Sequence, residues 1–297
     1  MVRRRGRGTW LALGLASATG LLIAARFATG CSDDAPQDPA ALPVTPEDAA
    51  KRSTDAELGE GSVVDGPEPC GQDGGAAIRV GAAGATFCID TTEISRAQYA
   101  AFLATTPTTS AQAAECAWNT TFVPNADWPD AGAVANPELP VTSVDWCDAV
   151  AYCSAFGKRL CGGVGGGPSE FEREAGAARS GEWYVACSHN GDQLFPYGTT
   201  QDPTACNGAD GGSAKPVGSV ARCQGGYPGL FDMTGNVQEW RNACKVNEGG
   251  AGPQDDLCRL GGGSYGTTVD NQSCETIFQG NRSGAFKDLG FRCCSAR

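Results

Sequence analysis

The sequence contains only one histidine, His189, among its 297 residues. Sites that need two or more histidines are therefore excluded, including HExxH zinc sites, three-histidine zinc sites and the iron site of two histidines and one carboxylate. Basic residues are also few, with 22 Lys and Arg against 34 Asp and Glu and a net charge of −12. Nucleic-acid binding by charge needs clustered Lys and Arg to neutralise phosphates, so we expect none.

Amphipathic helical patterns are scarce as well, whereas cysteine and glycine are abundant. The chain has 15 cysteines and 42 glycines, together with 41% hydrophobic residues. This hydrophobic content indicates a folded chain, and the glycine content indicates many loops. Cysteine at this frequency is typical of exported proteins that are cross-linked by disulfides. The composition therefore predicts an exported, loop-rich domain held by cross-links.

The first segment, residues 1–30, has the pattern of a secretory signal peptide. Basic residues precede an apolar run from Thr9 to Ala25, and the small residues Ala28–Gly30 follow it. A short apolar run of this kind is a targeting signal rather than a membrane span. The ending at Cys31 resembles a bacterial lipoprotein box, in which the cysteine carries lipid and becomes the first residue. The segment lacks the usual leucine three places before the cysteine and contains Arg26, so an ordinary cleaved signal or an uncleaved anchor is the alternative.

Residues 31–69 are predicted to be an acidic flexible tether between lipid and domain. Proline, alanine and aspartate dominate this stretch, and it contains no aromatic residue. Such a segment cannot bury enough apolar surface to fold, and its charge keeps it extended. Lipid on Cys31 would thus anchor the exported chain to a membrane, in the periplasm or at the cell surface. The sequence does not distinguish the inner from the outer membrane and gives no oligomeric state.

Residues 70–297 are predicted to form one domain, which contains the other fourteen cysteines. An even number of cysteines in an exported chain indicates a disulfide framework, although parity does not give the pairing. Two helices are expected in this domain. Ser95–Gln98 has the capping-box pattern ahead of an apolar stripe. The second helix runs from about Trp146 to Phe156, and Gly157 is its natural C-terminal cap.

Several segments carry specific motifs in a fixed order. The most specific are Asp-Met-Thr-Gly-Asn-Val-Gln-Glu-Trp, the later Gly-Gly-Ser and the final Gly-Phe-Arg-Cys. The five segments are Phe87–Ser95, Pro140–Leu160, Glu182–Gly198, Gly229–Trp240 and Arg259–Cys293. Together they resemble the formylglycine-generating enzyme family, also called the sulfatase-modifying factor family, over about residues 85–297.

The resemblance implies an α+β domain with the complex C-type-lectin-like (sulfatase-modifying factor) fold, which has little regular secondary structure and is rich in disulfides. Active members oxidise a sulfatase cysteine to formylglycine with molecular oxygen. In those enzymes two cysteines, five residues apart after the Gly-Gly-Ser, bind copper as thiolates. Here the segment from Ser264 to Arg292 contains one cysteine, Cys274. Because soft thiolates are the ligands suited to Cu(I), copper binding is not expected.

Other family positions also differ from the active pattern. The aromatic residue that lines the oxygen pocket in active members is Gln238 here, and the arginine expected three residues after Cys274 is Ile277. Ser264 does match the family's active-site serine. Its hydroxyl could equally stabilise a turn in a structural Gly-Gly-Ser, so no catalytic residue is assigned.

The resemblance also supplies two disulfide pairings. The family positions correspond to Cys153–Cys293 and Cys187–Cys274 in this chain. Two further pairs, Cys244–Cys258 and Cys206–Cys223, are predicted because each brackets a polar or glycine-rich loop. The remaining cysteines are left unpaired by this reasoning, namely Cys70, Cys88, Cys116, Cys147, Cys161 and Cys294.

Calcium is the cofactor that the resemblance implies most directly. Family members bind it in the loop that corresponds to Asp232–Glu239, where Asp232 and Glu239 would give carboxylate oxygens and Gly235 and Val237 backbone carbonyls. Hard oxygen ligands from one loop suit Ca²⁺. The alternative is an acidic helix cap and a solvated glutamate. A weaker second site would use Asn207, the Gly208 carbonyl and Asp210.

The sequence therefore favours an exported, lipid-anchored domain that acts as a non-catalytic binding or scaffold module in the cell envelope. Its ligand would be an envelope protein, a peptide or a glycan, and the membrane contact would be the lipid on Cys31. The rival hypothesis is a formylglycine-generating oxidase with a rearranged site. A purely structural envelope module is the third possibility.

Overall fold

The structure is a computed structural model that describes residues 70–71, 74–82, 84–125, 128, 135–173 and 181–296. The predicted signal peptide, the lipidation site at Cys31 and the tether up to residue 69 lie outside the described residues. Within the described ranges, no helix is long and apolar enough to cross a membrane.

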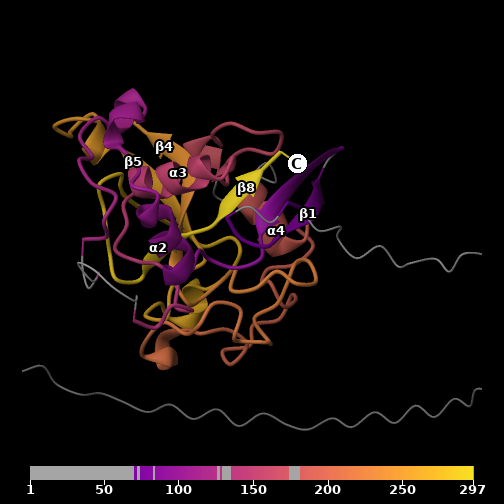
Figure 1. Cartoon of the computed structure of the whole chain (residues 1–297). Coiled ribbons are helices and arrows are strands. Elements are labelled where there is room, and N and C mark those ends of the chain that lie inside the picture. Colours follow the sequence, from indigo (N-terminus) through magenta and orange to yellow (C-terminus); the bar gives the residue numbers. More distant parts are fainter. Residues whose placement is uncertain are drawn as a thin grey trace, which may run out of the picture. The chain divides into compact units, whose positions relative to one another are not determined.

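The first sheet combines the two ends of the domain. Its strands pair in the order β1-β2-β8-β3, and every neighbouring pair is antiparallel. The strands are β1 (Ala77–Ala82), β2 (Ala85–Asp90), β3 (Arg159–Leu160) and β8 (Cys293–Ser295). Figure 1 shows β8, from the C-terminal end of the chain, running between the N-terminal hairpin and the middle of the domain.

The second sheet is formed by the C-terminal half of the chain, in the order β6-β5-β4-β7. Its strands are β4 (Gln238–Lys245), β5 (Leu257–Gly261), β6 (Ile277–Asn281) and β7 (Leu289–Phe291). β4 pairs in parallel with β7, while the other two pairs are antiparallel. Because β8 follows β7 after a single residue, Arg292, the chain passes from the second sheet to the first at this point.

Of the three α-helices in the part of the chain that the structure describes, two occur where the sequence predicts them. In α2 (Arg96–Ala104), Ser95 and Gln98 form both bonds of the capping box. α3 (Trp146–Ala155) has a second capping box and ends before Gly157, whose φ is +67°. The glycine accepts this left-handed backbone without the steric cost of a side chain.

The third helix, α4 (Glu182–Ser188), is short and was not predicted as a helix. Six single 3-10 turns complete the helical structure of the described residues. They are η1 (Thr109–Ala111), η2 (Ala114–Cys116), η3 (Phe171–Arg173), η4 (Ala209–Gly211), η5 (Pro253–Asp255) and η6 (Val269–Asn271). Regular structure is therefore sparse, as the fold class implies.

The apolar core divides into two main clusters. One packs α2 and α3 against β4 and β7, with Tyr152 stacked on Tyr99 and in edge contact with Phe291. The other packs α4 against β2, around Trp183 and Phe87. The two clusters meet at β8, where Cys293 belongs to the first cluster and Cys294 to the second.

Seven disulfides pair all fourteen cysteines of residues 70–297. Four are the predicted pairs Cys153–Cys293, Cys187–Cys274, Cys206–Cys223 and Cys244–Cys258. The other three, which the sequence left open, are Cys70–Cys88, Cys116–Cys147 and Cys161–Cys294.

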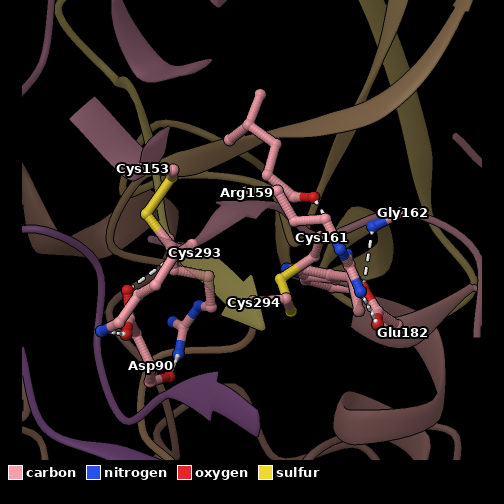
Figure 2. The surroundings of a disulfide bond; sticks show 12 residues. Asp90, Cys153, Arg159, Cys161, Gly162, Glu182, Cys293 and Cys294 are labelled. Atoms are coloured by element: carbon pink, nitrogen blue, oxygen red, sulfur yellow. Dashed lines mark hydrogen bonds and ion pairs between the residues drawn. A yellow bond between two sulfur atoms is a disulfide. The ribbon is translucent and has the colours of Figure 1, made fainter. Parts of the chain in front are cut away.

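Two of these bridges start from consecutive residues of β8. Neighbouring side chains of a strand point to opposite faces, so Cys293 reaches Cys153 on α3 while Cys294 reaches Cys161 after β3 (Figure 2). The bridged residues are 140 and 133 positions apart in the chain. Cross-links that close such long loops restrict the unfolded chain strongly.

The capping box of α3 places two carboxyl groups in the protein interior. Asp145 Oδ1 accepts a bond from the Asp148 amide at 2.9 Å, and Asp148 Oδ2 accepts one from the Asp145 amide at 3.1 Å. Burial raises the pKa of Asp145 to about 6 and that of Asp148 well above its ordinary value. Since both folded-state pKa values exceed the unfolded ones, the folded state binds more protons than the unfolded state.

This difference predicts a pH-dependent stability that one substitution changes. The protonated carboxyls contribute fully to stability below about pH 4, which is the pKa of an aspartate in the unfolded chain. The contribution of Asp145 is lost as the pH rises through about 6, its pKa in the folded state. Asp145→Asn keeps an effective N-cap and removes one buried charge. We expect it to raise the free energy of unfolding at pH 7.5 by on the order of 1–2 kcal/mol and to have less effect at pH 4.5.

Urea unfolding at both pH values measures this effect. Asp192→Asn, at an exposed position, is the control and should change the free energy of unfolding by no more than about 0.5 kcal/mol at either pH. A loss of stability in Asp145→Asn at pH 7.5 would show that the ionised carboxylate is needed by the fold.

Candidate functional site

A buried ion pair lies where the chain crosses between the sheets. Arg292 Nη2 donates to Glu239 Oε1 at 2.7 Å, and Arg292 Nε lies 2.8 Å from Glu239 Oε2. Trp183 Nε1 donates to the same Oε2 at 2.8 Å. The guanidinium also donates to the carbonyls of Asp90 and Phe231. This one arginine therefore connects β2, β4 and the loop before residue 232.

The sequence predicts the Glu239 carboxylate as a calcium ligand, and that role stays a prediction. In the structure both of its oxygens accept bonds from Arg292, and one also accepts the Trp183 bond. Glu239 is 1% exposed, so the ion pair is enclosed by protein. The alternative of a solvated glutamate is wrong, because burial and the guanidinium replace water.

Asp232 and Glu93 lie near this ion pair, and each carboxylate has one oxygen without a hydrogen-bond partner. Asp232 Oδ2 accepts a bond from the Gly218 amide at 2.6 Å, and Glu93 Oε1 accepts one from Asn236 Nδ2 at 3.0 Å. Among the described residues, Asp232 Oδ1 and Glu93 Oε2 are buried without any hydrogen-bond partner. Buried polar atoms are nearly always bonded, so these two need a further partner.

The local charge indicates what kind of partner this is. Glu93, Asp232 and Glu239 supply three buried carboxyl groups, whereas Arg292 supplies one cation. Burial raises the pKa of Glu93 well above its usual value, and the neighbouring charge of Asp232 adds to this. Burial likewise raises the pKa of Asp232 to about 6. In their ionised state the three carboxyls exceed the one cation by two negative charges, which suits a hard divalent cation.

Asn236 joins this cluster to the second predicted calcium loop. Its Oδ1 accepts a bond from Asn207 Nδ2 at 3.1 Å, and its main-chain N–H donates to the main-chain carbonyl of Asn207 at 2.8 Å. Asn207 Oδ1 is another buried oxygen without a partner among the described residues. The side chain of Asp210 lies outside the described residues. The structure therefore brings the two predicted loops together through Asn236.

Gly235 and Val237 lie in the same buried loop. Gly235 has a φ of +75°, and a Cβ atom there would lie 2.6 Å from the Asn207 carbonyl oxygen. A side chain at this position would separate the two loops, so glycine permits their contact. Val237 is 1% exposed. Glu93 and Asn236 were not predicted as site residues, although both belong to the segments that carry the resemblance.

The Gly-Gly-Ser segment forms a separate polar network. Ser264 Oγ donates to Asp288 Oδ2 at 2.8 Å and lies 3.2 Å from Thr267 Oγ1. Gln272 Nε2 donates to the carbonyls of Ser264 and Thr267 at 3.0 and 2.9 Å. Thr267 and Gln272 are five residues apart, the spacing at which the resemblance places two thiolates. Hydroxyl and amide groups occupy this segment, and Cys274 is bonded to Cys187.

Among the described residues, one group of three His, Cys, Asp or Glu side chains brings its ligand atoms within 4.8 Å of one another. It consists of the Sγ atoms of Cys161 and Cys294 and a carboxylate oxygen of Glu182. The two sulfurs form a disulfide, and the Glu182 carboxylate is bonded by the Arg159 guanidinium and the Gly162 amide (Figure 2). All three groups thus have structural partners.

Comparison with known proteins identifies the family to which this chain belongs. The sulfatase-modifying factor enzyme 1-like domain matches residues 52–297. The inactive C-alpha-formylglycine-generating enzyme 2 of Mus musculus is 33% identical over 196 residues, which cover 59% of this chain and 56% of that protein. The formylglycine-generating enzyme of Thermomonospora curvata is 34% identical over 157 residues, 46% of this chain and 45% of that enzyme. Among solved structures, Treponema denticola variable protein 1 is 18% identical with a TM-score of 0.49, over 77% of this chain and 99% of that chain.

Two small sheets, sparse helices and seven disulfides define a C-type-lectin-like domain of the sulfatase-modifying factor type. The domain match covers most of the sequence, and the chain belongs to the sulfatase-modifying factor family. It spans about half the length of the curated relatives that it matches. Those relatives include both a member named inactive and members named as enzymes. Similarity alone therefore does not distinguish the two roles, and the residues of the site are needed to do so.

Proposed function

We propose that this chain is a non-catalytic member of its family, exported and lipid-anchored, which binds a ligand or partner in the cell envelope. The observation that carries the proposal is the network of Ser264, Thr267 and Gln272. It fills the segment where an oxidase needs two thiolates, and it contains no sulfur.

The state of Cys274 supports the same role. The oxidase chemistry of the family uses free thiolates, whereas Cys274 is 1% exposed and bonded to Cys187. Similarity to a relative named inactive is consistent with a domain that keeps the fold without the reaction. Ser264 remains, but its hydroxyl donates to Asp288 and thereby holds the segment that follows β6. A rearranged oxidase is the alternative, because other relatives are named formylglycine-generating enzymes.

We expect the full chain to leave a Cys-x-Pro-x-Arg peptide unchanged under oxygen with added Cu(I), because no thiolate pair is present to hold the metal. Mass spectrometry of the peptide measures conversion, and the Thermomonospora curvata enzyme is the positive control. Thiol titration of residues 70–297 in denaturant without reductant should find no free thiol, since all fourteen cysteines are bridged. Formylglycine product, or two reactive thiols in the native domain, would establish the oxidase instead.

Calcium is proposed as the resident cation of the cluster around Asp232. Asp232 and Glu93 would bind it through their unpaired oxygens, with the predicted carbonyls of Gly235 and Val237 completing the loop. When bound, the cation would neutralise the two excess charges and hold the loop before β4 in place. Glu239 contributes indirectly, since its ion pair with Arg292 fixes the position of this loop.

We expect saturating calcium to raise the melting temperature of the chelator-treated protein by about 5–10 °C, as binding at a hundred times Kd stabilises by about 2.7 kcal/mol. Glu93→Gln and Asp232→Asn should each lose most of this increase. Glu172→Gln, at an exposed glutamate paired with Lys245, is the matched control and should retain it. A melting temperature that is the same in calcium and in chelator would contradict the proposal.

The lipid anchor is tested independently of the domain. Cys31→Ala should move the chain from the membrane fraction to the soluble exported fraction, because a thioether-linked lipid requires the cysteine sulfur. Cys31→Ser serves as the isosteric control and should behave in the same way. If either variant stays in the membrane fraction after a high-salt wash, an uncleaved signal anchor holds the chain.

A further inference from the structure

A small cavity lies beside the Ser264 network, and the charge of its lining residues differs from that of the chain as a whole. Its volume is about 260 Å³. Tyr265 and Lys287, which line it, are the neighbours in sequence of the bonded residues Ser264 and Asp288. The remaining lining residues come from the start of α2, the segment before α3 and the loop after η4, and are Arg96, Leu139, Pro140, Thr142, Ser143, Ser213 and Ala214.

The charge of the cavity is opposite to that of the protein. The chain has a net charge of −12, yet the cavity is lined by Arg96 and Lys287 and by no acidic residue. Arg96 Nη1 donates to the Ala135 carbonyl at 3.3 Å, which leaves most of its donors for another group. Lys287 is exposed and has no ion pair among the described residues. Two cations facing one small space select for an anionic group.

The hydroxyl groups of the cavity are also available. Ser143 is 4% exposed, and its main chain is fixed by bonds with the Phe286 carbonyl and the Asn125 amide, each at 2.9 Å. Its hydroxyl has no partner among the described residues, although the residue is buried and lines the cavity. Its φ of +60° is a strained conformation for a serine. Strain of this kind is retained where the surrounding structure imposes it, and it is frequent at binding sites.

Thr142, Ser213 and Tyr265 line the space together with Ser143, so four of its lining residues carry a hydroxyl group. Each can both donate and accept a hydrogen bond, which matches the hydroxyl groups of a sugar. Leu139, Pro140 and Ala214 add an apolar wall suited to the C–H face of a sugar ring. The volume lies just below the ~300 Å³ at which pockets for drug-sized ligands begin, and it suits one ring rather than an oligosaccharide.

We propose that this cavity binds one acidic sugar residue, with its carboxylate between Arg96 and Lys287 and its hydroxyls toward Ser143 and Tyr265. The inference rests on the proposed non-catalytic binding function and names the ligand class of that site. The cations select the carboxylate, and the hydroxyl groups select the ring. The Ser264–Asp288 hydrogen bond fixes the positions of Tyr265 and Lys287, the two cavity residues next to it in sequence.

Titration of the full, calcium-treated chain with D-glucuronate and D-galacturonate, followed by calorimetry or NMR, tests the proposal. At least one uronate should bind, and neutral D-glucose should bind at least tenfold more weakly. Raising the salt concentration from 50 to 500 mM should weaken uronate binding, since the exposed Lys287 charge is screened. Lys287→Gln and Arg96→Gln should each raise Kd about tenfold or more, as expected for the loss of a charge-assisted hydrogen bond.

Lys245→Gln is the matched control, because it removes the same charge at a residue that pairs with Glu172 away from the cavity, and it should leave Kd unchanged. Ser143→Ala should weaken binding without changing the melting temperature by more than a few degrees. Absence of uronate binding, or equal binding of glucose, overturns the proposal. Tighter binding of an acetylated glutamate peptide than of either uronate overturns the sugar assignment. The peptide oxidation assay separately tests whether the domain is catalytic. Failure of the uronate proposal can therefore be distinguished from failure of the proposed non-catalytic function.

Discussion

The guanidinium of Arg292 is completely enclosed, and its charge is balanced by the carboxylate of Glu239. Two buried charges are stable only when their partners are present, and removal of one typically costs 3–5 kcal/mol. Since Arg292 stands between β7 and β8, its bonds to Glu239, Asp90 and Phe231 fix how the second sheet meets the first. The position of the loop that contains Asp232 follows from this arrangement.

The same ion pair leaves the neighbouring carboxylates with an excess of negative charge. Asp232 and Glu93 each retain an unpaired buried oxygen, and Asn236 connects them to the loop around Asn207. Few strands and helices cross this region, so hydrogen bonds, disulfides and the proposed cation supply the rigidity that regular structure would otherwise give. Loss of the thiolate pair leaves this framework intact, because Ser264 and Gln272 bond the segment through oxygen and nitrogen atoms.

Much of the fold was predictable because local signals act alone. The capping box of α2, the apolar face of α3 and the glycine after α3 depend on residues close in sequence, and the family motifs order the segments. Four disulfides followed from family positions or from short loops. The pairs Cys116–Cys147 and Cys161–Cys294 did not, since their partners meet only when helices and strands pack. α4 was missed because its seven residues are buried on all sides, which hides any helical periodicity.

The family, and the presence of a single cysteine between Ser264 and Arg292, can be read from the sequence, because they depend on residue identity and spacing. The partner of Glu239 is visible only in the folded chain, since Arg292 lies 53 residues away and reaches it through the parallel pairing of β4 with β7. Packing likewise brings Glu93 close enough to Asp232 for their charges to interact, and it places Arg96 and Lys287 in one cavity. Charges far apart in the chain acquire their roles from the packing that excludes water between them.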